Sequence, residues 1–311
     1  MVARIVAGRA NPELAGRIAA ALASPLVPVQ FETFPDGELR PAVGEVRGED
    51  VYLVQPTGPP VSENLVELLL LLDACRRAGA DRVSAVVPYF GYARQDRRGT
   101  PGEAVGARMA ADVITAAGAD RVIVVDPHTL ALEAMFGVPV EMLSAVALLA
   151  GAVRPALPED AVVIAPDLGA LKLARRFSAL LGMGFGVVSK HRLSGATVRA
   201  EELVGDVAGR SVLIVDDMIS TGATIEAAMS VVRAHGAEPY VTVAASHGLF
   251  VGPAAQRLQR PGLRRLVVTD STVHREDLGL PLSTESIAGL LADAIGRLHN
   301  SQPLDGLLIP T

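Results

Sequence analysis

The chain has 311 residues, of which 50% are hydrophobic and 20% charged, and its 28 Lys and Arg residues against 34 Asp and Glu residues give a formal charge of −6. This composition excludes intrinsic disorder, which requires low hydrophobicity and high net charge, and the length predicts two domains. The acidic balance argues against a general nucleic-acid-binding protein, and no apolar run reaches the length of a membrane span.

Two residue types are rare in the sequence. Cys75 is the only cysteine, so no intrachain disulfide forms, and no Cys/His pattern with zinc spacing is present. The N-terminus lacks the apolar core of a signal peptide. We therefore expect a cytoplasmic protein. Lys172 and Lys190 are the only lysines among the 28 cations, and because Arg and Lys differ at special sites, both deserve a mutational test.

Helical patterns alternate with short β-branched runs along the chain. Apolar residues at helical spacing predict helices over residues 64–78 and 224–234. The β-branched runs predict strands over residues 82–87, 121–125, 161–165, 211–215 and 241–245. Because these runs lack strict polar alternation, they are typical of strands buried on both faces. The pattern predicts an α/β protein with parallel sheets.

The most informative segment is residues 212–224, with the sequence VLIVDDMISTGAT. An apolar strand is predicted to end at Asp216 and Asp217, followed by a hydroxyl-rich turn and a helix that starts near Thr224. Ligands of open α/β sheets bind beyond the carboxyl ends of strands. The turn residues could bind a phosphate through backbone N–H groups and the helix dipole; they are Ser220, Thr221, Gly222, Ala223 and Thr224. The two acids would then accept hydrogen bonds from ribose hydroxyls.

The simpler alternative is a helix start capped by Ser or Thr, which are favoured residues at that position. Two adjacent acids after four apolar residues make this alternative the minority interpretation. The segment resembles the phosphoribosyl-diphosphate signature of type I phosphoribosyltransferases and their relatives. The signature is specific to that superfamily and does not identify the reaction.

Further motifs follow in a fixed order along the chain. They are Phe34-Pro-Asp-Gly-Glu38, Pro88-Tyr-Phe-Gly-Tyr-Ala-Arg-Gln-Asp-Arg97, Asp126-Pro-His128, Pro166-Asp-Leu-Gly169 and Lys190-His-Arg192. In this order and spacing they resemble the ribose-phosphate diphosphokinase family, also called phosphoribosyl-diphosphate synthetases, almost from end to end.

The resemblance implies a reaction and a domain organisation. The reaction is transfer of the diphosphate group of MgATP to the C1 hydroxyl of ribose 5-phosphate, with Mg²⁺ as cofactor and phosphoribosyl diphosphate and AMP as products. Two phosphoribosyltransferase-like domains with mainly parallel sheets are implied, at residues 1–145 and 146–285. Residues 286–311 would return to the first domain. The ribose 5-phosphate site would lie in the second.

The resemblance also implies roles for single residues. Phe34, Asp36 and Glu38 would hold the adenine, the ring by stacking and the carboxylates through the exocyclic amine. Arg94, Gln95 and His128 would contact ATP. His128 and Asp167 would lie at the Mg²⁺, and Asp167 is chemically the better ligand because hard cations prefer oxygen. Lys190 and Arg192 would act as catalytic cations on a mobile loop, while Asp216, Asp217 and the 220–224 turn would bind ribose 5-phosphate.

Each motif also has a simpler interpretation when it is taken singly. Asp36-Gly37 is typical of a tight hairpin turn. Phe34 fits an ordinary core position, and the charged run after Arg94 fits a solvated loop. A lone His such as His128 is more often structural than catalytic. Asp167 fits a plain strand-to-helix turn, and Lys190 with Arg192 fits an exposed connection. The joint occurrence of these motifs in order favours the functional interpretation.

The sequence departs from the family pattern at residues 101–104, at Ser220, at Leu168 and Ala170, and in the C-terminal segment 301–311. Residues 101–104 are Pro-Gly-Glu-Ala, where phosphate-activated members carry a Ser-Arg-Ala-Pro-like segment that binds regulatory phosphate or ADP. This puts phosphate activation and ADP allostery in doubt. Ser220 stands where many members have Asp, which is closer to the plant-type and archaeal-type branches.

Family members share the Phe34-type loop with a neighbouring subunit's ATP site, so the resemblance implies a homo-oligomer of unspecified size. The expected partners are therefore ATP, ribose 5-phosphate and further copies of the chain, without nucleic acid or membrane. Two alternative functions are a non-catalytic regulatory homologue and, less favoured, a base phosphoribosyltransferase. The latter would leave the first domain unexplained.

Overall fold

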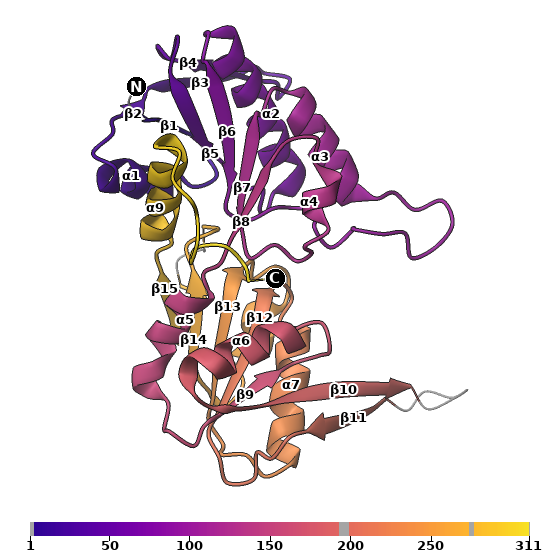
Figure 1. Ribbon diagram of the computed structural model, residues 1–311. Coiled ribbons are helices and arrows are strands. Elements are labelled where there is room, and N and C mark those ends of the chain that lie inside the picture. Colours follow the sequence, from indigo (N-terminus) through magenta and orange to yellow (C-terminus); the bar gives the residue numbers. More distant parts are fainter. Residues whose placement is uncertain (1–2, 193–198, 274–276, 311) are drawn as a thin grey trace. The chain divides into compact units, whose positions relative to one another are not determined.

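The computed structural model describes residues 3–192, 199–273 and 277–310, with the backbone alone described at residues 190–192 and 199–201. The chain divides into two compact units (Figure 1). The first unit comprises residues 1–144, 271–273 and 286–311, and the second comprises residues 145–270 and 274–285. No helix among the described residues has the length and apolar character needed to cross a bilayer.

A parallel sheet forms the centre of the first unit, with strand order β2-β1-β5-β6-β7-β8 among its described residues. Its strands are β1 (Ala3–Ala7), β2 (Leu26–Val27), β5 (Asp50–Val54), β6 (Arg82–Val87), β7 (Arg121–Val125) and β8 (Val140–Leu143). A separate antiparallel hairpin consists of β3 (Val29–Thr33) and β4 (Leu39–Val43). The helices are α1 (Pro12–Ala21), α2 (Val61–Arg77), α3 (Gly106–Ala116), α4 (Leu132–Met135) and α9 (Ala288–His299).

Helices cover both faces of this sheet (Figure 1). Alternate strand residues such as Val51 and Leu53 pack in one core cluster with buried residues of α2 and α3. Helices α1 and α9 contact each other and β1, and cover the opposite face. Cys75 lies fully buried within α2, and burial raises the pKa of its thiol to about 12. Burial on both faces explains why the central strands β5, β6 and β7 are rich in apolar and β-branched residues.

The sheet of the second unit has the described order β11-β10-β9-β12-β13-β14-β15 and is parallel except for the β10–β11 pair. Its strands are β9 (Val162–Ala165), β10 (Gly184–Arg192), β11 (Arg199–Val204), β12 (Val212–Ile219), β13 (Val241–Gly248), β14 (Leu263–Thr269) and β15 (Leu282–Glu285). The helices are α5 (Val146–Val153), the 3₁₀ turn η1 (Arg154–Ala156), α6 (Leu171–Leu181), α7 (Ala223–Ala234) and α8 (Ala254–Leu258).

The second sheet has a separate apolar core cluster on each of its two faces. Val212 and Ile214 of β12 pack in one cluster with α7, whereas Leu213 and Val215 pack in another with α5 and α6. Successive side chains of a strand point to opposite faces, so β12 and its neighbours β9 and β13 contribute to both clusters. The expected α/β architecture with helix-flanked parallel sheets is confirmed in both units.

A buried ionic cluster fastens α9 to the first sheet. Asp50, at the start of β5, is only 4% exposed. Arg82 donates two hydrogen bonds to its carboxylate at 2.9 and 2.6 Å, and Nδ1 of His299 lies 2.8 Å from Oδ2. The Tyr52 hydroxyl donates a further bond at 3.2 Å. Burial alone would raise the pKa of Asp50, but the bonds from Arg82 and His299 outweigh burial and hold the pKa below its usual value.

We expect Asp50→Ala to destabilise the protein markedly. Removing one partner of a buried ion pair costs ~3–5 kcal/mol, and because Arg82 keeps some water contact we expect about 2–3 kcal/mol. The urea midpoint, followed by circular dichroism, measures this loss. Asp293→Ala is the matched control, since Asp293 forms an exposed i,i+4 pair with Arg297 on α9, and such pairs contribute about 0.5 kcal/mol or less.

The same carboxyl group gives a pH signature. A depressed native pKa contributes stability that is present above the unfolded pKa of about 3.9 and lost as the pH falls through the native value. The difference in unfolding free energy between wild type and Asp50→Ala should therefore shrink below about pH 4. A difference that is constant with pH would contradict the assignment of the stabilisation to the ionised carboxylate.

Candidate active site

Strand β12 carries the paired acids of the second unit. Its pairing with β13 continues through Asp216 to Ile219, with Asp216 opposite Ala245 and Met218 opposite His247. The expectation that the strand ends at the two acids is therefore wrong, and both lie inside β12. Pairing with the long neighbouring strand β13 explains the extension, because tertiary pairing outweighs the low strand propensity of Asp.

Three carboxylates lie beyond the end of β9: Asp167 in the loop that follows it, and Asp216 and Asp217 on the part of the adjacent strand β12 that extends past the β9 pairing. The amide of Asp217 donates to Oδ1 of Asp216 at 2.9 Å, and the amide of Met218 donates to Oδ1 of Asp217 at 2.8 Å. Burial raises the pKa of Asp216 well above its usual value, and the negative charges of Asp217 and Asp167 raise it further. Such a cluster of like charges favours ligands that carry hydrogen-bond donors or cations.

Asp167 opens the turn between β9 and α6. Its Oδ1 accepts hydrogen bonds from the amides of Gly169 at 2.8 Å and Ala170 at 3.3 Å. The simpler interpretation as a strand-to-helix turn is thus correct for the local geometry. The side chain is nevertheless only half-buried, and its electrostatic contact with Asp216 ties it to the acid cluster.

The 220–224 turn joins β12 to α7. Helix α7 begins at Ala223, one residue before the predicted start, and Gly222 occupies the N-cap position with φ 75°. No side chain caps this helix start, so the interpretation of Ser or Thr as its cap is wrong. A left-handed residue before a helix start turns consecutive N–H groups toward one point, an arrangement that binds anions.

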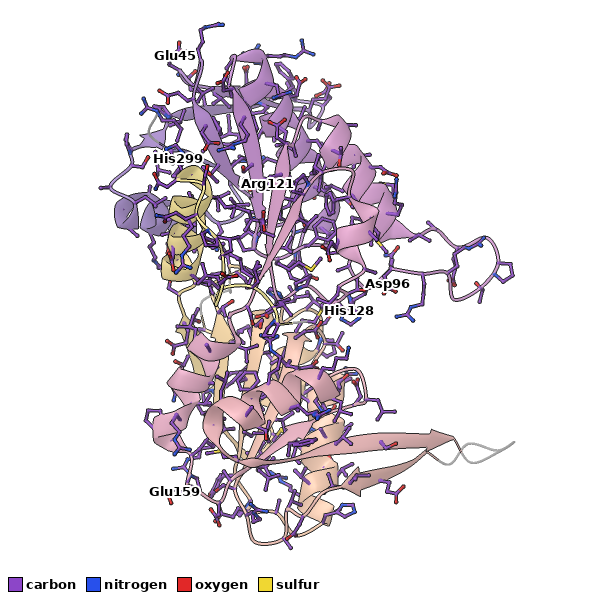
Figure 2. The ribbon with its side chains drawn as sticks, viewed as in Figure 1. Glu45, Asp96, Arg121, His128, Glu159 and His299 are labelled. Carbon is purple, nitrogen blue, oxygen red and sulfur yellow. The ribbon has the colours of Figure 1, made fainter. Side chains whose placement is uncertain are left out.

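In the first unit, the polar loops follow the adjacent strands β6 and β7. The loop after β6 lines an open pocket of about 520 Å³ that also contains His128. Arg94, Gln95 and His128 thus come together, and their side chains are solvent-exposed. Figure 2 shows Asp96 and His128 at the inner end of this loop.

Two acids of this pocket were not predicted as site residues. Asp96 accepts a hydrogen bond from Nε of Arg97 at 2.9 Å, which lowers its pKa, with smaller contributions from Thr129 and His128. Glu103 accepts from the amides of Gly99 at 2.6 Å and Thr100 at 3.0 Å and from the Thr100 hydroxyl, and these bonds lower its pKa.

Phe34, Asp36 and Glu38 form the tip of the β3–β4 hairpin. The amide of Phe34 donates to the carbonyl of Glu38 at 2.8 Å, and the amide of Glu38 donates to Oδ1 of Asp36 at 3.1 Å. The tight hairpin turn is therefore present. Phe34 is half-buried rather than part of the core, with the Arg40 guanidinium 5.3 Å from its ring centre. None of the three residues lines the Arg94 pocket.

Lys190 and Arg192 lie at the end of β10, where their backbones pair with Glu201 and Arg199 of β11. The expectation of a loop at these two positions is wrong, because the antiparallel partner strand β11 extends the pairing. Their side chains lie outside the described part of the structure, and so do residues 193–198.

Family models and curated relatives that match this chain all belong to one enzyme family. Residues 3–118 match the model for the N-terminal domain of ribose phosphate pyrophosphokinase, and residues 192–308 match that for the phosphoribosyl synthetase-associated domain. The ribose-phosphate pyrophosphokinase of Chlorobaculum tepidum is 40% identical over 98% of this chain and 94% of its own length. That of Clostridium perfringens is 39% identical over 98% of this chain and 97% of its own length.

A solved structure agrees with these matches. The phosphoribosylpyrophosphate synthetase of Mycobacterium smegmatis has a TM-score of 0.89 and 36% identity, covering 97% of this chain and all of that one. The second unit has an acid pair followed by a turn suited to anion binding, and the first unit has an arginine-lined pocket. These features are typical of enzymes that act on phosphorylated substrates. The chain belongs to the ribose-phosphate pyrophosphokinase family. The predicted family, fold class and enzyme class are confirmed.

Proposed function

We propose that the chain transfers the diphosphate group of MgATP to the C1 hydroxyl of ribose 5-phosphate. The C1 oxygen attacks the β-phosphorus of ATP and the bond from that phosphorus to the α–β bridging oxygen breaks, giving 5-phosphoribosyl 1-diphosphate, AMP and a proton. The observation that carries this proposal is the acid pair of β12 followed by the left-handed Gly222 turn. Carboxylates beside an anion-binding turn match a sugar that carries hydroxyls and a phosphate.

The second unit would hold the acceptor substrate. Asp216 and Asp217 accept hydrogen bonds from the ribose hydroxyls, and the turn binds the 5-phosphate through its N–H groups and hydroxyls. The turn residues are Ser220, Thr221, Gly222, Ala223 and Thr224. Binding at both ends of the sugar orients C1 for attack, and orientation is the main contribution of a protein to phosphoryl transfer.

ATP would be held by groups of the first unit. Arg94, Gln95 and His128 line one pocket, where the Arg94 guanidinium suits phosphate oxygens. We place the adenine at Phe34, Asp36 and Glu38 on the exposed hairpin tip, which would reach an ATP site of a neighbouring copy in a homo-oligomer. Sedimentation or size-exclusion measurements test this assembly, and a strictly monomeric active enzyme would exclude it.

The side chains of the candidate site fit a Mg²⁺ ion whose ligands come mainly from the substrate phosphates. Among the described residues there is no group of three His, Cys, Asp or Glu residues able to hold a metal. Mg²⁺ is usually bound by one or two carboxylates together with substrate phosphates, so Asp167 fits as its oxygen ligand and His128 as the less suited neighbour. When bound, the ion neutralises phosphate charge. Lys190 and Arg192 would stabilise the charge that develops on the transferring group.

The alternatives have less support. A regulatory homologue without activity would be expected to have altered catalytic loops, whereas His128, Asp167, Lys190 and Arg192 are all present. A base phosphoribosyltransferase would use only the β12 signature and leave the Arg94 pocket without a role. We also propose a cytoplasmic location, the expected place of a nucleotide-biosynthetic enzyme with one buried cysteine.

The test is direct. The purified chain is incubated with ribose 5-phosphate and MgATP, and the products are followed by ³¹P magnetic resonance, which distinguishes AMP and phosphoribosyl diphosphate from ADP. Equal formation of AMP and phosphoribosyl diphosphate supports the proposal. The absence of product with and without added inorganic phosphate would refute it, and diphosphate release from phosphoribosyl diphosphate with a free base would instead support the transferase alternative.

Inorganic phosphate is expected not to activate this enzyme. Glu103 stands in the segment where phosphate-activated relatives carry basic and hydroxyl groups, and its hydrogen bonds favour the ionised form. A carboxylate in the pocket repels a phosphate activator. In an activity titration, phosphate should give no increase, and ADP should inhibit only by competition with ATP. Sigmoidal or phosphate-dependent kinetics would contradict this prediction.

A further inference from the structure

The segment 249–258, which leads from β13 through α8, packs against the 220–224 turn of the same unit. The amides of Leu249 and Phe250 donate to the carbonyl of Ile219 at 2.9 and 3.1 Å. The amide of Val251 donates to the carbonyl of Ser220 at 3.0 Å. The carbonyl groups at the end of β12 are thus held by the backbone of this segment.

Arg257 of α8 holds the next carbonyl along the turn with its side chain. Its Nη1 donates to the carbonyl oxygen of Thr221 at 3.3 Å, and its Nε lies 3.5 Å from Oε2 of Glu226 on α7. The guanidinium therefore links the 220–224 turn to the first turn of α7. The side chains of Arg257 and Glu226 are only 35% and 20% exposed, so this link is partly shielded from water.

The direction of these carbonyl groups fixes the direction of the N–H groups. A trans peptide is planar and holds its C=O and N–H on opposite sides. When the carbonyls of Ile219, Ser220 and Thr221 face the 249–258 segment, the N–H groups of the following residues face away from it. The N–H of Gly222 shares its peptide with the carbonyl that Arg257 holds, and it lies where the anion-binding turn meets α7.

Close packing at Gly222 supports a role for α8 in shaping the turn. A Cβ at Gly222 would lie 3.2 Å from Cγ of Leu258, tighter than an ordinary contact, and the residue has φ 75°. Helix α8 thus contacts the 220–224 turn in two ways: Arg257 donates a hydrogen bond to it, and Leu258 packs against Gly222.

We propose that Arg257 is a positioning residue for ribose 5-phosphate. By holding the Thr221 carbonyl and Glu226, it keeps the Thr221–Gly222 peptide in the orientation that presents its N–H to the 5-phosphate. This inference rests on the proposed function of the turn and adds a residue that does not itself touch the substrate. Arg257 acts on the affinity for the sugar phosphate and not on ATP or the chemical step.

The chain offers a matched control in Arg260. Its Nη2 lies 2.6 Å from Oε1 of the same Glu226, and its contacts among the described residues do not include the turn. If Arg257 were only one half of a surface ion pair, removal of either arginine would have the same small effect.

Steady-state kinetics of the full-length enzyme separate these roles. Arg257→Ala should raise KM for ribose 5-phosphate about tenfold, equivalent to ~1.4 kcal/mol, while kcat and KM for ATP stay within about twofold. Arg257→Lys should recover part of the affinity, and Arg260→Ala should leave all three parameters within about twofold. An unchanged KM for ribose 5-phosphate in Arg257→Ala, an equal rise for both substrates, or the same effect in Arg260→Ala would overturn the proposal.

A binding measurement separates this inference from the proposed reaction. The rise in thermal midpoint caused by ribose 5-phosphate alone is compared between wild type and Arg257→Ala. A smaller rise in the variant supports the positioning role, and equal rises overturn it. A wild type that yields no phosphoribosyl diphosphate would refute the proposed reaction, and the thermal comparison would then decide the role of Arg257 by itself.

Discussion

Lys190→Ala is expected to reduce kcat by about 10²–10³-fold, the usual effect of removing one group that stabilises transition-state charge. The KM for ATP should change little, because the interaction forms mainly as charge develops on the transferring diphosphate. The residue lies near the end of β10, and the resemblance to the family implies a catalytic lysine at this position. Single-turnover measurements with saturating substrates test the effect on the chemical step.

The rarity of lysine provides the control. Lys172, the only other lysine, lies exposed near the start of α6, and Lys172→Ala should leave kcat and both KM values unchanged. Lys190→Arg keeps the charge but alters its geometry, so we expect only partial activity. If Lys190→Ala retained the wild-type kcat, Lys190 would have no role in the transfer step.

Asp216→Asn is expected to lower kcat/KM for ribose 5-phosphate while raising the stability of the protein. The amide keeps one acceptor oxygen but replaces the other with an NH₂ donor that cannot accept from a ribose hydroxyl, so we expect a loss of about 10²-fold. The same substitution removes one of three clustered carboxylates, whose mutual repulsion and burial raise the pKa of Asp216. A gain of ~1 kcal/mol would raise the thermal midpoint by about 2–4 °C.

The opposite signs of the two effects make this test sharp, since a misfolded variant cannot be both more stable and less active. Asp160→Asn is the control, because Asp160 is an exposed acid of the same unit and should change neither quantity. Loss of stability in Asp216→Asn would show that the carboxylate is a structural group. Unchanged kcat/KM would remove Asp216 from the ribose site.

The elements predicted most accurately from the sequence are strands that are buried on both faces. The bounds of β6 and β7 agree with the predicted runs at 82–87 and 121–125, because a β-branched run buried on both faces has little freedom to be anything else. The extension of β12 through Asp216 was not predictable in this way. Local propensity disfavours Asp in a strand, and only the partner β13 makes the extension favourable.

The residues of the candidate site likewise include some that the sequence predicted and some that it did not. Roles for His128 and Asp167 were implied by the family resemblance, and both residues lie in loops that follow strands, where ligands of α/β sheets bind. Glu103 and Arg257 were not predicted. Both side chains contact backbone groups of other residues, Glu103 in a loop and Arg257 from a short helix. The residue type alone does not reveal such contacts in a sequence.

The bond between His299 and Asp50 joins α9 to β5, a strand that begins at residue 50. On a ribosome we therefore expect the face of the first sheet that α9 covers to be covered by α1 alone until α9 has been made. The second unit, whose strands lie between, can complete its core earlier. We therefore expect the first unit, whose strands are synthesised first, to complete its core last.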